Sequence, residues 1–289
     1  MKTLIAALAL SAVLALPAAA EETISIVAAT NFYGEAAAAV GGDRVAVASV
    51  LIAPGTDPHD FDPPPSVARA VADADIVIMN GAGYDHWMEH LIESNEVDGR
   101  IVIDVAELIG VEEGQNPHVW YDPKAMPALA AALSDALSEI APEAADDFAA
   151  ARDALVATMV PVDEKVAELR ARFGGTEVAA TEPVFGYMAD ALGLTMTNEA
   201  FQTAIMNEVE PSASDIAALE DDIRSGRVSV LFYNEQVVDA FTRNLADLAR
   251  ASGVPLVSVT ETQPDGRTFA EWMLDSLDET AKALGDPST

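Results

Sequence analysis

Short apolar runs alternate with longer amphipathic stretches along most of the chain. The apolar runs are rich in Val, Ile and Ala without polar alternation, so they predict buried strands at 23–29, 45–52, 75–80, 100–104, 177–181, 228–233 and 255–259. The amphipathic stretches predict helices, among others at 32–40, 66–72, 123–140, 184–192, 212–225 and 235–251. Non-alternating strands separated by helices are typical of parallel sheets covered on both faces. The pattern therefore predicts the α/β fold class.

Residues 142–173 contain no strand pattern. Apolar side chains recur at helical spacing from Phe148 to Leu169, with charge on the opposite face. Pro161 predicts a kink or a break in this helix, and Gly174 and Gly175 predict its end. We expect two lobes of parallel sheet flanked by helices and joined by one long spine helix. The expected bounds are 21–141 for the N-terminal lobe, 142–173 for the spine helix and 174–289 for the C-terminal lobe.

The first twenty residues are typical of a secretory signal peptide. Lys2 is followed by an apolar stretch at 4–16 and by small residues at 18–20, as in an A-x-A cleavage site. The stretch is too short for a membrane anchor, which needs about 20 apolar residues. Since the chain contains no cysteine, it offers no site for an N-terminal lipid. We expect a soluble protein without a lipid anchor, in a bacterial periplasm.

Composition narrows the class of protein. Hydrophobic residues make up 51% of the 289, which excludes a disordered chain. Asp and Glu number 48 against 15 Lys and Arg, for a formal net charge of -33. Such a charge repels phosphate backbones and anionic lipid headgroups, so we expect no nucleic-acid partner and no peripheral membrane attachment. The absence of cysteine also excludes disulfides and thiolate metal sites.

Two of the four histidines lie in similar surroundings. His59 and His118 each follow a predicted strand and precede a predicted helix, in loops stiffened by proline. Ligands of parallel α/β sheets bind at the carboxyl ends of strands, and a neutral imidazole in a stiff loop is a good metal ligand. Either histidine alone is more simply a surface or hydrogen-bonded loop residue. Their matching positions favour a metal site.

The other two histidines form a different pattern. His86, Glu89 and His90 match the H-x-x-E-H motif of inverted zinc metallopeptidases, so a secreted zinc metallopeptidase is the alternative function. A five-residue pattern also arises by chance. In the favoured interpretation 86–90 belong to an ordinary helix that packs Trp87 and Met88 into the core. Asp85, Glu89 and Glu93 then form its solvated face, and the protein is not an enzyme.

Four segments carry a resemblance to a known family: 58–63 (PHDFDP), 116–120 (NPHVW), 181–187 (TEPVFGY) and 259–262 (VTET). In order and spacing, essentially the whole mature chain resembles the solute-binding receptors of bacterial ABC importers for zinc, manganese or iron. That resemblance implies one cation enclosed in the interlobe cleft by two side chains from each lobe. The matching positions are His59, His118, Glu182 and Glu261. Some members of this family are described as adhesive.

The resemblance also bears on the metal. Zinc-type relatives have a histidine where this chain has Glu182, whereas manganese- and iron-type relatives have a carboxylate. The fourth position is usually Asp, so Glu261 departs from the pattern, and Glu235 and Asp265 remain alternatives. Two imidazoles and two carboxylates neutralise a dication, and bidentate carboxylates would favour Mn²⁺ geometrically over tetrahedral Zn²⁺. We expect Mn²⁺ as the transported ligand, with Zn²⁺ or Fe²⁺ as alternatives.

The implied activity is capture and delivery without chemistry. By resemblance, the loaded protein docks as a monomer on a membrane ABC permease, and the spine helix limits lobe movement. The chain has no G-x-x-x-x-G-K-[ST] phosphate loop, so the ATP that powers transport is hydrolysed elsewhere. Because histidine must be neutral to bind metal, we expect affinity to fall below about pH 6.5.

Overall fold

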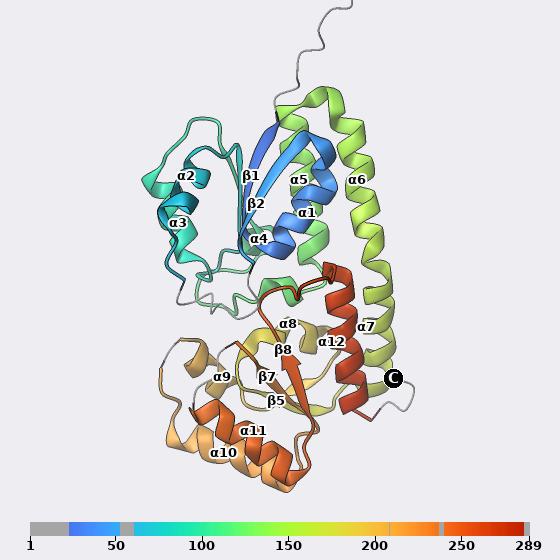
Figure 1. Ribbon diagram of the computed structural model, residues 1–289. Helices are drawn as coiled ribbons and strands as arrows, with labels where there is room; N and C mark the ends of the chain where they lie inside the picture. Colours follow the sequence, from blue (N-terminus) through green and yellow to red (C-terminus); the bar gives the residue numbers. More distant parts are fainter. Residues whose placement is uncertain (1–22, 53–60, 208, 237–239, 286–289) are drawn as a thin grey trace, which may run out of the picture.

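Each of the two lobes is built on a four-stranded parallel sheet (Figure 1). The chain is described here by a computed structural model, in which residues 23–52, 61–207, 209–236 and 240–285 are placed. Every paired strand in both sheets runs parallel to its neighbour. The fold class expected from the sequence is confirmed.

The N-terminal sheet has the strand order β2-β1-β3-β4. Its central strand β3 is buried along its whole length, as the continuous apolar run predicts. The strands of this lobe are β1 (Ile24–Thr30), β2 (Val45–Leu51), β3 (Ile76–Met79) and β4 (Ile101–Asp104). The helices are α1 (Asn31–Gly41), α2 (Pro65–Ala72), α3 (His86–Ser94), α4 (Val105–Leu108) and α5 (Ala125–Ile140), with 3-10 turns η1 (Gly42–Arg44), η2 (Val119–Tyr121) and η3 (Pro142–Ala144).

The C-terminal sheet has the order β6-β5-β7-β8, so β7 lies between β5 and β8. Its strands are β5 (Glu177–Ala180), β6 (Thr195–Met196), β7 (Leu231–Asn234) and β8 (Leu256–Val259). The helices are α8 (Gly186–Ala191), α9 (Glu199–Met206), α10 (Ala213–Ser225), α11 (Ala240–Ser252) and α12 (Phe269–Ala283), with the 3-10 turn η4 (Pro183–Phe185). The sequence pattern did not indicate the short edge strand β6.

Two nearly continuous helices run along one side of both lobes (Figure 1). They are α6 (Ala145–Thr158) and α7 (Val160–Phe173), separated only by Met159. Pro161 lies in the first turn of α7, where its missing N–H has no helical partner to lose, and the break expected near it is confirmed. Helix α6 packs on α1 and α5, whereas α7 packs on α12. Among the described residues, every helix is too short or too polar to span a bilayer.

One apolar core extends across the boundary between the lobes. Phe32 of α1 lies 5.7 Å from Trp272 of α12, ring centre to ring centre. Tyr121 of η2 lies 5.2 Å from Phe185 of η4 in an edge-to-face contact. Opening the cleft widely would expose these large rings to water, at about 25 cal/mol for each Å² of apolar surface. The packing therefore opposes wide separation of the lobes.

Candidate metal centre

Three metal-ligating side chains meet between the lobes: His118, Glu182 and Glu261. His118 and Glu261 are fully buried, and Glu182 is 4% exposed. Nε2 of His118 lies 3.6 Å from Oε2 of Glu261 and 4.0 Å from Oε1 of Glu182. Two atoms bound to one ion at about 2.1 Å are at most about 4.2 Å apart, so both distances allow a shared ion. In the described part of the chain, no other three His, Cys, Asp or Glu side chains lie this close.

Strand ends place the two carboxylates. Glu182 follows β5 by one residue, and Glu261 follows β8 by one residue. Since β5 and β8 flank β7 in one parallel sheet, their carboxyl ends lie at the same edge. His118 approaches from the N-terminal lobe, where its loop is held by a 2.8 Å hydrogen bond from Asn80 to the carbonyl of Pro117. The site therefore joins the two lobes.

Asn116 sets the tautomer of His118. Nδ2 of Asn116 donates to the carbonyl of Pro183 at 2.8 Å, so its Oδ1 faces the imidazole. That oxygen only accepts, hence Nδ1 of His118, 2.7 Å away, carries the proton and donates it. The lone pair of Nε2 is then directed at the carboxylates, as a metal ligand requires. A Cβ on Gly186 would lie 2.8 Å from Nδ2 of Asn116, so a larger residue there would displace the Asn116 side chain that orients His118.

Aromatic side chains surround the imidazole. The rings of Trp120 and Tyr84 lie 5.3 and 6.1 Å from that of His118, both edge-on. Burial, and then the negative charge of Glu261, raises the pKa of Tyr84 well above its ordinary value. Tyr84 therefore stays neutral and keeps its O–H proton beside the carboxylate. The aromatic rings of Trp120 and Tyr84 lower the local polarity around the imidazole, which strengthens the charge interactions there.

Asn234, the last residue of β7, lies between the two carboxylates. Its Nδ2 donates to Oε2 of Glu182 and to Oε1 of Glu261, each at 2.7 Å. Gln236, two residues after Asn234, adds a further contact: its side-chain oxygen accepts the main-chain N–H of Glu261. Sequence reasoning missed Asn234. Its only signal was a polar residue at the carboxyl end of an apolar strand.

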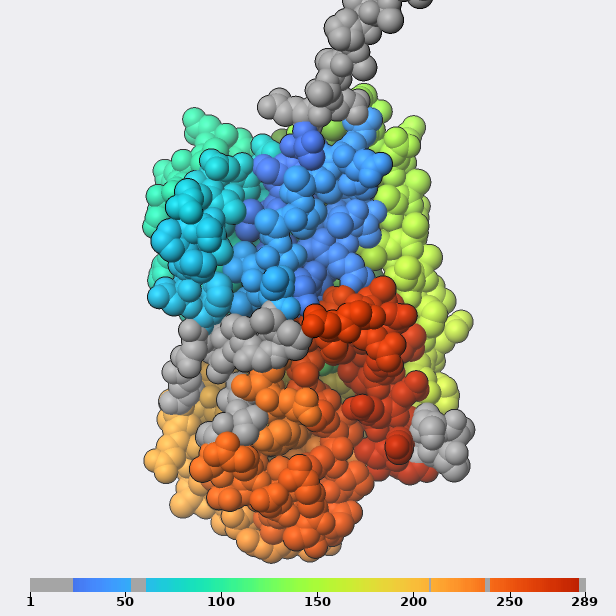
Figure 2. Space-filling view, viewed as in Figure 1, coloured from blue at the N-terminus to red at the C-terminus, as the bar shows by residue number. Residues whose placement is uncertain are grey.

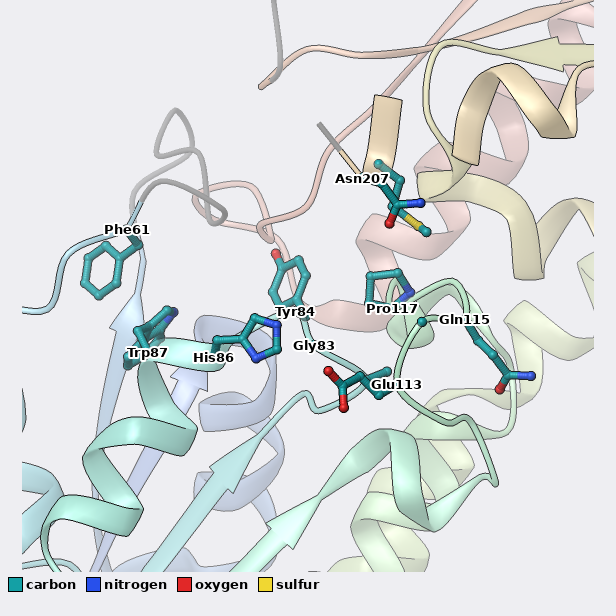
Figure 3. Close-up of a pocket in the computed structure, with 12 residues that line it drawn as sticks. Phe61, Gly83, Tyr84, His86, Trp87, Glu113, Gln115, Pro117 and Asn207 are labelled. Carbon is teal, nitrogen blue, oxygen red and sulfur yellow. The ribbon is translucent and has the colours of Figure 1, made fainter. Parts of the chain in front are cut away.

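A cavity of about 400 Å³ adjoins the cluster (Figure 3). Tyr84 and Pro117 line it next to the site, and Asn207 lines it from the C-terminal lobe. His86 and Glu113 lie on adjoining sides of the same space in Figure 3. The cavity therefore offers a polar approach, with contributions from both lobes, toward the buried cluster.

The structure brings together three of the four expected ligands. His59 lies outside the described residues. Of the acids considered for the C-terminal lobe, Glu261 lies in the cluster, whereas Glu235 and Asp265 are exposed. Glu235 instead accepts a hydrogen bond from Ser258. Glu235 directly follows Asn234, whose side chain faces the cluster, and successive side chains of an extended chain point to opposite sides, so Glu235 is turned away from the cleft.

The H-x-x-E-H segment forms the start of α3. Met88 is fully buried and Trp87 half-buried, as expected for a helix packed on the core. The side chain of His86 is 55% exposed and donates from Nδ1 to Glu89 at 3.0 Å, which raises the pKa of His86. The interpretation of Asp85 as a solvated residue was wrong. Asp85 is completely buried, because its carboxylate accepts the main-chain N–H groups of Asn80 and Gly81.

The donor set suits a divalent cation. Two buried carboxylates in one small volume repel each other, and burying charge without compensation is costly. A dication would offset both negative charges, with imidazole nitrogen and carboxylate oxygen as donors. This combination serves Zn²⁺, Fe²⁺ and Mn²⁺.

Comparisons with known proteins identify a matching family and several relatives. The model of the family ZnuA, zinc-uptake complex component A, periplasmic, matches residues 26–283. The manganese-binding lipoprotein MntA of Halalkalibacterium halodurans is 23% identical over 278 residues, covering 91% of this chain and 89% of that protein. The zinc-binding lipoprotein AdcA of Streptococcus pneumoniae is 25% identical over 281 residues, covering 88% and 54%, so the chain spans about half of that relative. Both are named lipoproteins, whereas this chain contains no cysteine.

Solved structures share the fold. The periplasmic zinc binding protein TroA of Treponema pallidum matches with a TM-score of 0.76 at 20% identity, over 91% of this chain and 99% of that one. The binding protein FpvC of Pseudomonas aeruginosa, solved in complex with Mn²⁺, matches with a TM-score of 0.74 at 20% identity, over 91% and 98%. These likenesses confirm the two-lobed architecture with its long helical connection.

Proposed function

We propose a function for this chain from its membership of the ZnuA family of periplasmic zinc-uptake components. It captures one divalent transition-metal ion between its lobes and delivers that ion to a membrane ABC permease. The observation that carries this proposal is the buried cluster of His118, Glu182 and Glu261, drawn from both lobes. The chain's own role is to bind and release, with no covalent step. Delivery takes place in the periplasm.

His59 is the proposed fourth ligand. It lies outside the described residues, but Phe61, two positions along the chain, lines the cavity beside the cluster. Two imidazoles and two carboxylates would sum to zero charge with a dication, which offsets much of the desolvation penalty. The histidines bind only when neutral, so affinity falls as the pH is lowered through the mildly acidic range.

Mn²⁺ is the proposed cargo, with Zn²⁺ or Fe²⁺ as alternatives. Support for Mn²⁺ comes from the carboxylate at position 182, where zinc-type relatives have an additional imidazole, since oxygen donors suit Mn²⁺. Intrinsic affinity opposes it, because most nitrogen and oxygen sites hold Zn²⁺ more tightly. Selection of Mn²⁺ therefore depends on the geometry of the carboxylates and on supply.

Metal analysis of the purified mature protein tests the proposal. We expect one equivalent of Mn²⁺ or Zn²⁺ per chain, with affinity reduced more than about 100-fold in His118→Ala. The matched control is the double variant His86→Ala/His90→Ala, which should retain the full metal content. Loss of metal in the control, together with retention in His118→Ala, would instead support the metallopeptidase alternative.

A further inference from the structure

Sheet topology places one neutral side chain between two charged ones. Strand β7 lies between β5 and β8, so its last residue, Asn234, falls between Glu182 and Glu261. Its single Nδ2 group donates one hydrogen bond to each carboxylate, both at 2.7 Å. Both N–H bonds of the amide are therefore committed to the acids of the site.

The orientation of this amide is fixed from the other side. Oδ1 of Asn234 accepts the main-chain N–H of Gln236 at 3.0 Å, which leaves only Nδ2 to face the carboxylates. The main-chain N–H of Asn234 donates to the hydroxyl of Thr181 at 3.2 Å, next to Glu182. Asn234 is fully enclosed, with 1% of its surface exposed. A flipped amide would present its oxygen to two carboxylates, so the observed orientation is the favourable one.

The hydrogen bonds occupy a particular pair of oxygens. Asn234 binds Oε2 of Glu182 and Oε1 of Glu261. The opposite pair, Oε1 of Glu182 and Oε2 of Glu261, is the pair that faces Nε2 of His118. Each carboxylate thus offers one oxygen to the shared point and keeps the other on the amide.

We infer that Asn234 is a positioning residue that holds both carboxylates in single-oxygen coordination and thereby shifts the site's selectivity toward Zn²⁺ relative to Mn²⁺. This inference rests on the proposed function, since it concerns the same ion. Four single-atom donors suit tetrahedral Zn²⁺, whereas Mn²⁺ favours an octahedral oxygen-rich shell. A carboxylate released from the amide can turn and bind through both oxygens, which adds the donors that Mn²⁺ prefers. Asn234 therefore lowers the affinity for Mn²⁺ relative to that for Zn²⁺ in the unaltered protein.

The test is Asn234→Leu, which keeps the branched shape of the side chain and removes both N–H donors. Competition titrations should show the ratio Kd(Mn²⁺)/Kd(Zn²⁺) falling about tenfold, within the range typical of residues that orient metal ligands. X-ray absorption of the manganese-loaded variant should show more oxygen donors than in the unaltered protein. Neither change is expected from a merely structural role, which would weaken both metals equally.

The matched control is Asn198→Leu. Asn198 is also a buried amide of the C-terminal lobe, but it bonds the main chain of Ala180 rather than a carboxylate. It should leave the ratio unchanged. A ratio in Asn234→Leu within threefold of the unaltered protein would overturn the inference. If Asn234→Leu does not fold, Asn234→Ser, which keeps one O–H donor, is measured under the same criterion.

Two failures remain distinguishable in this design. An unaltered protein that binds no stoichiometric metal contradicts the proposed function itself. An unaltered protein that binds one equivalent, with a ratio insensitive to Asn234, contradicts only the role assigned to this residue.

Discussion

Glu182 places a carboxylate oxygen 4.0 Å from Nε2 of His118, and Glu261 places another 3.6 Å from the same nitrogen. At position 182 the donor atom offered to the metal can be either a carboxylate oxygen or an imidazole nitrogen. An imidazole there would add a softer donor that binds through a single atom and carries no negative charge. Because imidazole suits Zn²⁺ and carboxylate suits Mn²⁺, the side chain at 182 should change which ion is held more tightly.

The substitution Glu182→His tests this choice. We expect the preference for Zn²⁺ over Mn²⁺ to rise at least about tenfold, since the new donor favours zinc and one negative charge is lost. Competition titration of both metals measures the ratio. Glu199→His, at an exposed position on α9 in the same lobe, is the control and should leave the ratio unchanged. An unchanged preference in Glu182→His would show that this position does not discriminate between the metals.

The proposed metal ligands leave a trace in the sequence, but the residues that orient them do not. His118 was identifiable because histidine is rare in this chain and lies in a stiff loop. Asn116 and Asn234 were not assigned roles, because a neutral amide has no ligand chemistry of its own and acts only through the geometry around it. Asp85 was misjudged for a related reason. Helical spacing predicted a solvated face, whereas the carboxylate caps a turn whose conformation the spacing does not show.

At the scale of secondary structure, burial made most strands predictable. Strands such as β3 are continuous apolar runs, so their positions follow from the hydrophobic pattern of the sequence. The edge strand β6 has only two residues and offers no pattern. The choice among Glu235, Glu261 and Asp265 could not be made from the sequence, because it depends on where β7 and β8 end and on which side chains then face the cleft. Strand order, which brings Asn234 between the acids, was likewise invisible.

The turn before α3 is held in place by a titratable group, the carboxylate of Asp85. Gly81, Ala82 and Gly83 all have positive φ, a costly conformation for alanine, and Asp85 holds the turn through two main-chain N–H groups. Burial raises the pKa of Asp85 to about 7, despite the opposing effect of those hydrogen bonds. This turn carries Tyr84, which packs against His118. Protonation of Asp85 is therefore linked to the stability of a segment beside the site.

The sign of this linkage gives a prediction for Asp85→Asn. Because the folded pKa exceeds the unfolded one, Asp85 contributes stability that is fully present below about pH 4 and is lost as the pH rises through about 7. The free energy of unfolding of the unaltered protein, minus that of the variant, should therefore increase as the pH falls from 7 to 4. Urea unfolding across this range measures the difference. Glu93→Gln, on the exposed face of α3, should show no such trend, and parallel pH profiles for Asp85→Asn would contradict the assignment.

For the molecule as a whole, contacts across the cleft should control release of the ion. Glu35 of α1 accepts the main-chain N–H of Phe269, at the start of α12, at 3.1 Å, and also a hydrogen bond from Gln263 at 2.5 Å. Figure 2 shows the segment that leads into α12 lying against the N-terminal lobe. Asn31 adds a 2.8 Å hydrogen bond to the carbonyl of Gln263. These bonds all close the cleft on the side of the C-terminal acid Glu261.

Removing the interlobe bond with Glu35→Ala should speed metal dissociation several-fold, because the closed arrangement loses two hydrogen bonds worth about 1 kcal/mol each. Stopped-flow measurement with a chelator gives the rate constant. Glu271→Ala is the matched control, since Glu271 caps the same helix through Thr268. It should lower the free energy of unfolding slightly, through loss of the capping box, without changing dissociation. Equal rates in Glu35→Ala and the unaltered protein would mean that these two hydrogen bonds do not limit opening.

The net charge of -33 acts over the whole surface and should determine how fast the cation arrives. A negative field concentrates dications near the cleft, where Glu113 lines the approach cavity. Raising the ionic strength from about 0.01 M to about 0.15 M shortens the screening length from about 30 Å to about 8 Å. We therefore expect the association rate constant for Mn²⁺ to fall at least about tenfold over this range.

The dissociation rate constant should change much less, because the ligand cluster is buried and screened weakly. Stopped-flow measurements in a series of NaCl concentrations separate the two, with sucrose as a control for viscosity. An association rate independent of salt would show that the acidic surface does not steer the ion, and its charge would then need an explanation unrelated to capture.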